Sequence, residues 1–120
     1  MPRPRKRRRV CCLPVNNVFG PEVKDLNIEK VIMSVDEYET IRLIDIERFT
    51  QQECSEKMNI ARTTVQSVYD SARTKLADCL VNCKMLVIEG GDYQLCDGVG
   101  MTCNERGCNR HRFGRKEREI

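Results

Sequence analysis

The segment MNIARTTVQSVY, residues 58–69, places a sharp turn between two helical stretches. Asparagine tolerates the left-handed backbone conformation, so Asn59 can end one helix and open a three-residue turn at 59–61. Apolar residues then return at Val65 and Val68, a spacing typical of one face of a helix. The polar residues between them lie off that face, so the second helix is predicted to begin with an exposed polar surface.

Two hydroxyl residues mark helix starts upstream of this turn. Ser34 with Glu37 and Thr50 with Glu53 have the capping-box form, in which hydroxyl and carboxylate satisfy free backbone amides. Two helices are therefore predicted to begin at these residues. The second of them is short, because it must end at the turn, and it spans residues 51–58.

Apolar residues recur with helical period on three stretches of the chain, at about 34–49, 51–58 and 62–80. Three amphipathic helices around a shared aliphatic core are therefore predicted, with no Trp available for packing. The apolar positions are Tyr38, Ile41, Leu43, Ile44 and Ile46 in the first helix, Cys54 and Met58 in the second, and Val65, Val68, Tyr69, Ala72, Leu76 and Leu80 in the third.

A short capped helix, a three-residue turn and a helix with a polar start match the helix-turn-helix motif. In that motif the second helix lays its N-terminal side chains into the major groove of DNA. Ser55 is small where the next helix would cross, and Asn59 replaces the usual Gly of the turn. An ordinary helical hairpin is the alternative, but agreement at this many positions favours DNA binding.

The third helix carries two sets of candidate DNA contacts. Arg and Gln are the side chains that bond in bidentate fashion to guanine and adenine edges, so the polar residues near its start are the candidate base readers. Residues on its flank or further along are assigned to phosphate or structural contacts. The base readers are Arg62, Thr63, Gln66 and Ser67, and the second set is Thr64, Arg73 and Lys75.

The rest of the chain adds little regular structure. A weak strand is predicted at 31–33, and a β-hairpin at 85–95, with its turn at the glycines of residues 89–92. The fold class is therefore mainly α: a three-helix helix-turn-helix domain with a small β-hairpin over residues 10–95. A basic N-terminal arm, residues 1–9, precedes this domain, and a Cys-rich basic tail, residues 96–120, follows it.

Positive charge is concentrated at the two ends of the chain. Residues 1–9 carry six Lys and Arg with no acidic residue, whereas residues 10–104 are net acidic. Basic arms on an acidic body indicate a polyanionic partner, although basic termini are also often simply solvated. Arg3 and Arg5 could enter a narrow minor groove, and nonspecific attraction to phosphates is the alternative.

Eight cysteines in 120 residues raise the question of metal binding. Cys54 and Cys79 lie on apolar helical faces and are expected to be buried hydrophobes. The tail has too few apolar residues to fold by burial, so zinc or an iron–sulfur cluster could order it. Its candidate ligands are Cys96, Cys103, Cys108 and His111. Cys11 and Cys12 could substitute for some of these ligands if the N-terminus folds back. The alternative is that the tail cysteines are free thiols and bind no metal.

Several protein classes find no support in the sequence. The chain has no apolar run long enough to cross a membrane and no secretory signal, which predicts a cytoplasmic protein. No nucleophile pairs with the single His and no Gly-rich phosphate loop is present, so an enzyme is not expected. The competing function is a metal or iron–sulfur thiol protein that uses the helices as a partner-binding scaffold. RNA polymerase is a further candidate partner. The apolar surface of residues 76–95 predicts a homodimer; the alternative is that this surface packs on residues 10–33 of the same chain.

The sequence also resembles known families. SVDEYETIRLIDIERFTQQECSEKMNIARTTVQSVYDSARTKLADCLV is similar to the region-4 helix-turn-helix of bacterial sigma factors. With RPRKRRRV before it and LVIEGGDY after it, the chain resembles uncharacterised protein family 0251, described as predicted DNA-binding proteins, over most of residues 2–95. The resemblance implies a helix-turn-helix fold and a DNA partner. This chain departs from the pattern at Ala61, where such helices usually start with Ser, which removes a cap worth about 1 kcal/mol.

Overall fold

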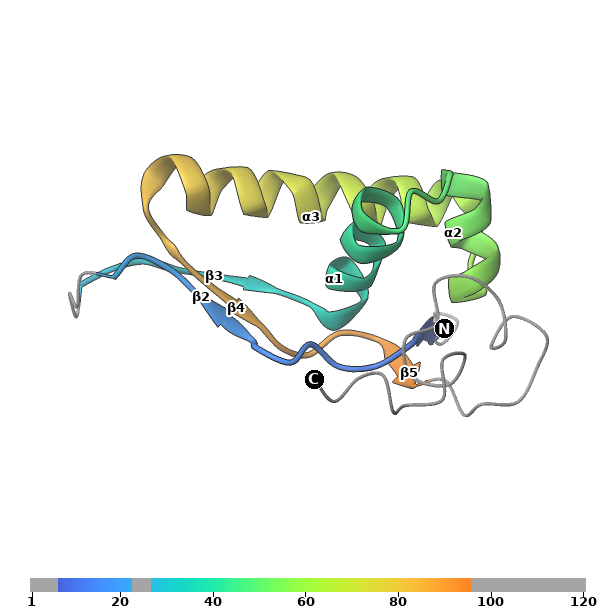
Figure 1. Cartoon of the computed structure of the whole chain (residues 1–120), viewed down its shortest axis with the longest axis horizontal. Helices are drawn as coiled ribbons and strands as arrows, with labels where there is room; N and C mark the ends of the chain where they lie inside the picture. Colours follow the sequence, from blue (N-terminus) through green and yellow to red (C-terminus); the bar gives the residue numbers. More distant parts are fainter. Residues whose placement is uncertain (1–6, 23–26, 96–120) are drawn as a thin grey trace, which may run out of the picture.

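A computed structural model describes residues 7–22 and 27–95 of the chain. The fold is mainly helical: three α-helices accompany short strands, and the long helix α3 runs above a twisted sheet (Figure 1). No helix in the described part of the chain is long and apolar enough to cross a membrane. The elements are β1 (Arg8–Val10), β2 (Val18–Phe19), β3 (Lys30–Met33), α1 (Val35–Ile41), the π-helical turn η1 (Arg42–Ile46), α2 (Gln51–Met58), α3 (Arg62–Asn82), β4 (Met85–Ile88) and β5 (Tyr93–Leu95).

Both predicted capping boxes are confirmed. The Ser34 hydroxyl accepts a hydrogen bond from the Glu37 amide at 3.3 Å, and the Glu37 carboxylate accepts one from the Ser34 amide at 2.9 Å. Thr50 and Glu53 exchange the same pair of bonds, at 3.0 and 2.9 Å. Each box satisfies amides that have no partner within the helix, which fixes where α1 and α2 begin.

The first helix is shorter than predicted, because its continuous α-helical form ends at Ile41 and η1 follows. In η1 the amide of Glu47 bonds back five residues to the carbonyl of Arg42 at 3.0 Å. A wider turn changes the direction in which later side chains point. Ile41 therefore packs on one core cluster while Leu43 is fully buried in another.

Two apolar clusters form the core, and α3 spans both. The first lies between α1, α3 and the strands, and the second lies beneath α2, η1 and the start of α3. Val65 belongs to the second cluster and Ala72 to the first. Because both residues lie on the same apolar face of α3, their separation along the helix sets the distance between the two clusters. The buried members are Val10, Met33, Val35, Ala72, Leu86 and Ile88 in the first cluster, and Leu43, Phe49, Cys54, Met58 and Val65 in the second.

The predicted β-hairpin at residues 85–95 is wrong. Strand β4 is central in a three-stranded sheet, antiparallel to β2 and parallel to β3, whereas β5 pairs in parallel with β1. Gly90 and Gly91 do adopt the positive φ expected of them, at 76° and 106°. The carbonyl of Gly90 accepts a 2.9 Å bond from the Val35 amide, so the chain crosses the start of α1 instead of reversing. A short strand, β2, also lies in the predicted loop.

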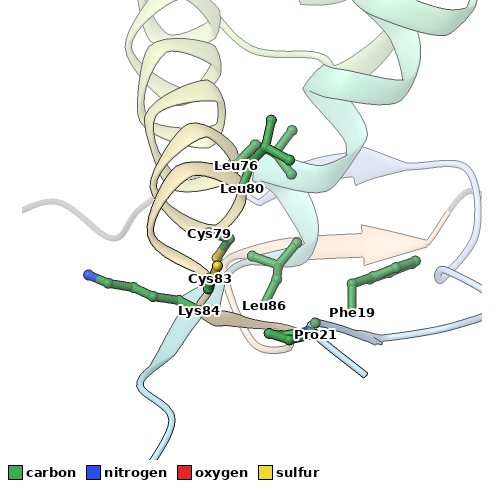
Figure 2. A pocket seen from close by; sticks show the side chains of 9 residues that line it. Phe19, Pro21, Leu76, Cys79, Leu80, Cys83, Lys84 and Leu86 are labelled. Carbon is green, nitrogen blue, oxygen red and sulfur yellow. The ribbon is translucent and has the colours of Figure 1, made fainter. Parts of the chain in front are cut away.

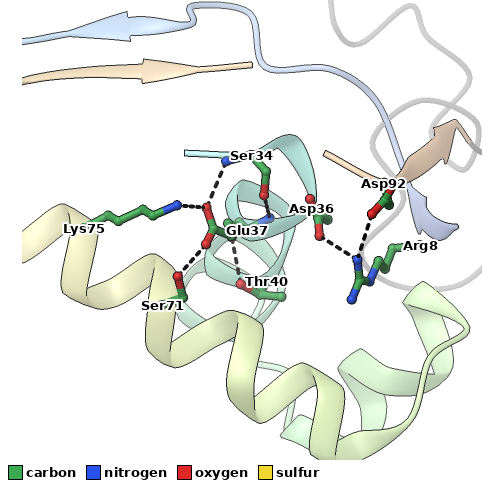
Figure 3. Close-up of polar contacts among 8 residues, drawn as sticks. All are labelled: Arg8, Ser34, Asp36, Glu37, Thr40, Ser71, Lys75 and Asp92. Atoms are coloured by element: carbon green, nitrogen blue, oxygen red, sulfur yellow. Dashed lines mark hydrogen bonds and ion pairs between the residues drawn. The ribbon is translucent and has the colours of Figure 1, made fainter. Parts of the chain in front are cut away.

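Arg8 does not belong to a solvent-exposed arm, contrary to the predicted boundary at residue 9. It lies in β1 with only 9% of its surface exposed. Its guanidinium is 3.4 Å from the buried carboxylate of Asp36 and 3.8 Å from that of Asp92 (Figure 3). Two carboxylates compensate the desolvation of this cation, and their positions depend on the tertiary fold.

Candidate nucleic-acid interface

The turn between α2 and α3 has the conformation predicted from its Asn. Asn59 is left-handed, with φ 61° and ψ 47°. The carbonyl of Glu56 accepts a 3.3 Å bond from the Asn59 amide, and that of Ser55 accepts a 3.0 Å bond from the Ile60 amide. These bonds satisfy the last carbonyls of α2 and turn the chain sharply into α3.

Close packing holds the two helices at a fixed angle. Cys54, Met58 and Val65 are fully buried where α2 meets α3. Ser55 is 4% exposed and donates its hydroxyl to the Gln52 carbonyl of its own helix at 2.7 Å. Burial raises the pKa of the Cys54 thiol to about 12, which keeps it protonated and makes it a packing residue.

The start of α3 presents polar side chains to solvent. Ala61 is the N-cap and provides no side-chain hydrogen bond, so the first amides of the helix lack a protein side-chain cap. Thr64 is half-buried on the flank. The four predicted base readers, Arg62, Thr63, Gln66 and Ser67, are all exposed on the first two turns.

Further along α3, Arg73 and Lys75 have different surroundings. The Arg73 guanidinium is exposed; it lies 5.5 Å from the centre of the Tyr69 ring and donates to the Tyr69 hydroxyl at 3.0 Å. That hydroxyl in turn donates to Asp45 at 2.8 Å, linking α3 to η1. Lys75 instead forms an ion pair with Glu37 at 2.7 Å, which joins α3 to α1. Arg73 therefore presents an exposed cation, and Lys75 does not present a free one.

Sequence reasoning missed the contribution of α2 to this surface. A shallow depression around the turn is lined by Gln52 and Glu56 of α2 together with the turn residues and Arg62. Gln52 donates to the Glu56 carboxylate at 3.0 Å. The four-residue spacing of Gln52 and Glu56 places both on one face of α2, and this pattern could have predicted the contribution of α2 from the sequence. Glu56 and the exposed Asp70 are acidic and would oppose a phosphate placed directly beside them.

The remaining predicted site residues lie outside the described part of the chain. They are Arg3, Arg5, Cys96, Cys103, Cys108 and His111.

An apolar groove lies at the opposite end of α3, between this helix and the sheet (Figure 2). Its volume is about 360 Å³, and Leu76, Leu80, Phe19 and Leu86 are among its lining residues. Strand β4 is hydrogen-bonded at both edges, to β2 and to β3 of the same chain. The helix side is less covered, because Leu80 is 82% exposed.

Comparisons with known proteins place the chain in one family. A family model described as "Protein of unknown function DUF134" matches residues 1–96. A UPF0251 protein of Desulfitobacterium hafniense (strain Y51) is 62% identical over 115 residues, covering 93% of this chain and 90% of the relative. A UPF0251 protein of Clostridium botulinum (strain Hall) is 45% identical over 108 residues, covering 88% of this chain and 69% of the relative. No solved structure matches. The chain therefore belongs to the DUF134 family of UPF0251 proteins.

Proposed function

We propose that this protein is a sequence-specific DNA-binding protein and regulates transcription, with α2, its turn and α3 acting as a helix-turn-helix. The observation that carries the proposal is the exposed start of α3. Arg62 and Gln66 are one helical turn apart there, on a helix fixed from behind by the fully buried Val65. A rigidly held helix with exposed bidentate donors suits a major groove, which admits one α-helix.

The acidic residues near the start of α3 support a role for cations outside it in contacting the DNA phosphates. The acidic groups Glu56 and Asp70 beside the recognition surface weaken its attraction for phosphate, so cations elsewhere must supply it. Arg73 is an exposed cation further along the same helix than Arg62. The basic N-terminal residues are the second source, because residues 1–6 include Arg3, Arg5 and Lys6 and no acidic residue.

A homodimer would complete the site. One short recognition helix touches too few base pairs for strong discrimination, and two-fold protein dimers commonly read paired half-sites. The groove beside α3 is lined by Leu76, Leu80 and Phe19, and Leu80 is 82% exposed. An exposed apolar surface present on each copy suits a self-complementary contact between two copies.

Selection from a random duplex library tests the proposal directly. Full-length protein is expected to enrich a motif, with two-fold symmetry if it binds as a dimer, and to hold it with an affinity that falls steeply as salt rises. The Arg62→Ala variant should retain weak binding but lose the motif. Failure of the wild-type protein to bind any duplex at low salt would rule the proposal out, and capture of RNA polymerase by that same protein would point to the other candidate partner.

A further inference from the structure

The end of α3 carries two cysteines beside the apolar groove. Cys79 and Cys83 are four residues apart, a spacing that places side chains on the same face of a helix. Both line the groove between α3 and the sheet (Figure 2). Both are free thiols, and Cys79 is half-buried whereas Cys83 is exposed. The pair is therefore a dithiol on the wall of a cavity of about 360 Å³.

Backbone hydrogen bonds hold the two cysteines in place at the end of the helix. The Cys79 carbonyl accepts a bond from the Cys83 amide and another, at 3.1 Å, from the Lys84 amide. Cys83 has a left-handed backbone, with φ 55° and ψ 49°. Glycine is the residue most often found in this conformation at a helix end, because a side chain makes it costly. The backbone alone would therefore favour glycine at this position, where the chain has a thiol instead.

The spacing of the pair suits a bridging ligand better than a direct disulfide. Side chains four residues apart on a helix have Cβ atoms about 5–6 Å apart, whereas the Cβ atoms of a disulfide are only about 3.5–4.5 Å apart. A disulfide between Cys79 and Cys83 would therefore distort the end of α3. An atom that bonds to both sulfurs spans a longer distance and leaves the helix intact.

The charges around the pair favour a bridging group that forms a neutral complex. Lys84 lines the groove, but its ammonium group already lies 3.0 Å from the Asp78 carboxylate and 3.5 Å from the Glu29 carboxylate. Copper(I) bound to two thiolates would keep one negative charge, and an uncompensated charge in an apolar groove carries a desolvation cost. Trivalent arsenic bound to two thiolates and one organic group is neutral.

We propose that Cys79 and Cys83 form a binding site for a trivalent arsenical that carries one organic group. In water the arsenical is the dihydroxide R–As(OH)₂. Two As–S bonds form and two As–O bonds break, and each thiol proton leaves with a hydroxyl group as water, so arsenic stays trivalent. The organic group R occupies the groove, whose apolar wall includes Phe19, Leu76 and Leu86.

This site does not rest on DNA binding. The homodimer proposed above would cover the same groove, so the thiols react in the single chain and the reaction is tested on dilute protein. The other cysteines of the described segments are less suited to bridging. Cys54 is fully buried between α2 and α3, and Cys11 is 5% exposed, which leaves Cys12 without an accessible neighbouring thiol.

Protection of thiols from alkylation tests the site in full-length protein. Reduced protein is treated with phenylarsine oxide, alkylated with N-ethylmaleimide and digested. Trypsin cuts after Lys75 and Lys84, so Cys79 and Cys83 leave together in the peptide 76–84, which holds no other cysteine. Phenylarsine oxide should protect both thiols of this peptide, and an excess of a small dithiol should remove the protection.

Single variants test the bridge between the two thiols. In Cys79→Ser and in Cys83→Ser the remaining thiol should need at least about a hundredfold more phenylarsine oxide for the same protection, because the second As–S bond forms within one complex. Cys12→Ser removes a thiol outside the site and should leave the protection of peptide 76–84 unchanged. Unchanged far-ultraviolet circular dichroism spectra would show that the variants are folded.

The size of the organic group tests the groove separately. Wild-type protein should bind phenylarsine oxide at least about tenfold more tightly than methylarsonous acid, since the phenyl ring is buried in the groove. Phe19→Ala should lower this preference by about threefold or more. Val18→Ala is the matched control, because neighbouring residues of a strand point to opposite faces and Val18 does not line the groove.

Three results would overturn the proposal. One is full alkylation of Cys79 and Cys83 in wild-type protein treated with phenylarsine oxide. Another is a pair of single variants that are protected at the same concentration as wild type, which would show that no bridge forms. The third is equal affinity for the phenyl and methyl arsenicals, which would show that the groove does not hold the organic group.

Discussion

Lys75 Nζ lies 2.7 Å from Glu37 Oε1, and this ion pair joins the middle of α3 to the first turn of α1 (Figure 3). The other carboxylate oxygen of Glu37 accepts a 2.6 Å bond from the hydroxyl of Ser71. Glu37 also belongs to the α1 capping box with Ser34. A single carboxylate therefore fixes both the start of α1 and its contact with α3.

We expect Glu37 to make stability depend on acid pH. Burial would raise its pKa, but hydrogen bonds from Lys75, Ser71 and Ser34 lower it below the ordinary value of 4.5. Its stabilising contribution is therefore complete above about pH 4.5 and is lost as the pH falls through the folded-state pKa. Glu37→Gln should reduce the free energy of unfolding by about 1–3 kcal/mol at pH 7. Urea unfolding from pH 7 to pH 3 should show a smaller acid-induced loss in this variant than in wild type, and parallel pH profiles would contradict the assignment.

Replacing Arg8 should destabilise the fold, whereas replacing its neighbour Arg7 should not. Arg8→Ala leaves the Asp36 carboxylate buried without its cation, and breaking such a pair typically costs about 3–5 kcal/mol. Arg7 is exposed, so Arg7→Ala is the matched control. Urea unfolding midpoints of the two variants would measure the difference. Equal midpoints would show that the strand β1 contributes no stability through this ion pair.

Removing residues 1–6 should flatten the salt dependence of DNA binding without unfolding the domain. This deletion takes away Arg3, Arg5 and Lys6 but keeps Arg8 in β1. Each phosphate contact that is lost should lower the slope of log affinity against log salt by about 0.9. Fluorescence anisotropy over a range of salt concentrations would measure it. An unchanged slope would mean that these residues do not contact the phosphates.

Substitutions on α3 should separate base reading from phosphate contact. Arg62→Ala and Gln66→Ala should each cost about 1–3 kcal/mol on the selected site and relax base choice. Arg73→Ala should weaken binding to selected and random duplexes alike, because we expect an exposed guanidinium away from the start of α3 to contact phosphate and not bases. Thr74→Ala, an exposed change on the same helix, is the control. If Arg62 and Gln66 variants lose equal affinity for both duplexes, neither residue reads bases.

Leu80→Glu should convert a dimer into a monomer. Leu80 lines the apolar groove and is 82% exposed, and a charge buried there on association would cost far more free energy than burial of a leucine gains. Ala77→Glu adds the same charge at another exposed position of α3 and should leave the dimer intact. Light scattering at micromolar concentration would give the mass of each. A wild-type mass of one chain, with and without DNA, would contradict the dimer.

The helices and the turn follow from the sequence because the interactions that set them are local. Ser34 and Thr50 bond to residues only three positions away, and Asn59 takes a conformation that its own side chain permits. The bounds of α2 and the start of α3 were therefore predictable to the residue. The exposure of Arg62, Thr63, Gln66 and Ser67 follows from the same helical period that buries Val65.

Only the tertiary structure decided the strand partners and the buried ions. The run Met85–Ile88 can pair with any complementary strand, and its neighbours come from residues 18–19 and 30–33, distant in the chain. Arg8 is buried because Asp36 and Asp92 meet it in space, and Lys75 is engaged because α1 brings Glu37 to it. Strand pairing and desolvation depend on nonlocal contacts, which residue type and spacing do not specify.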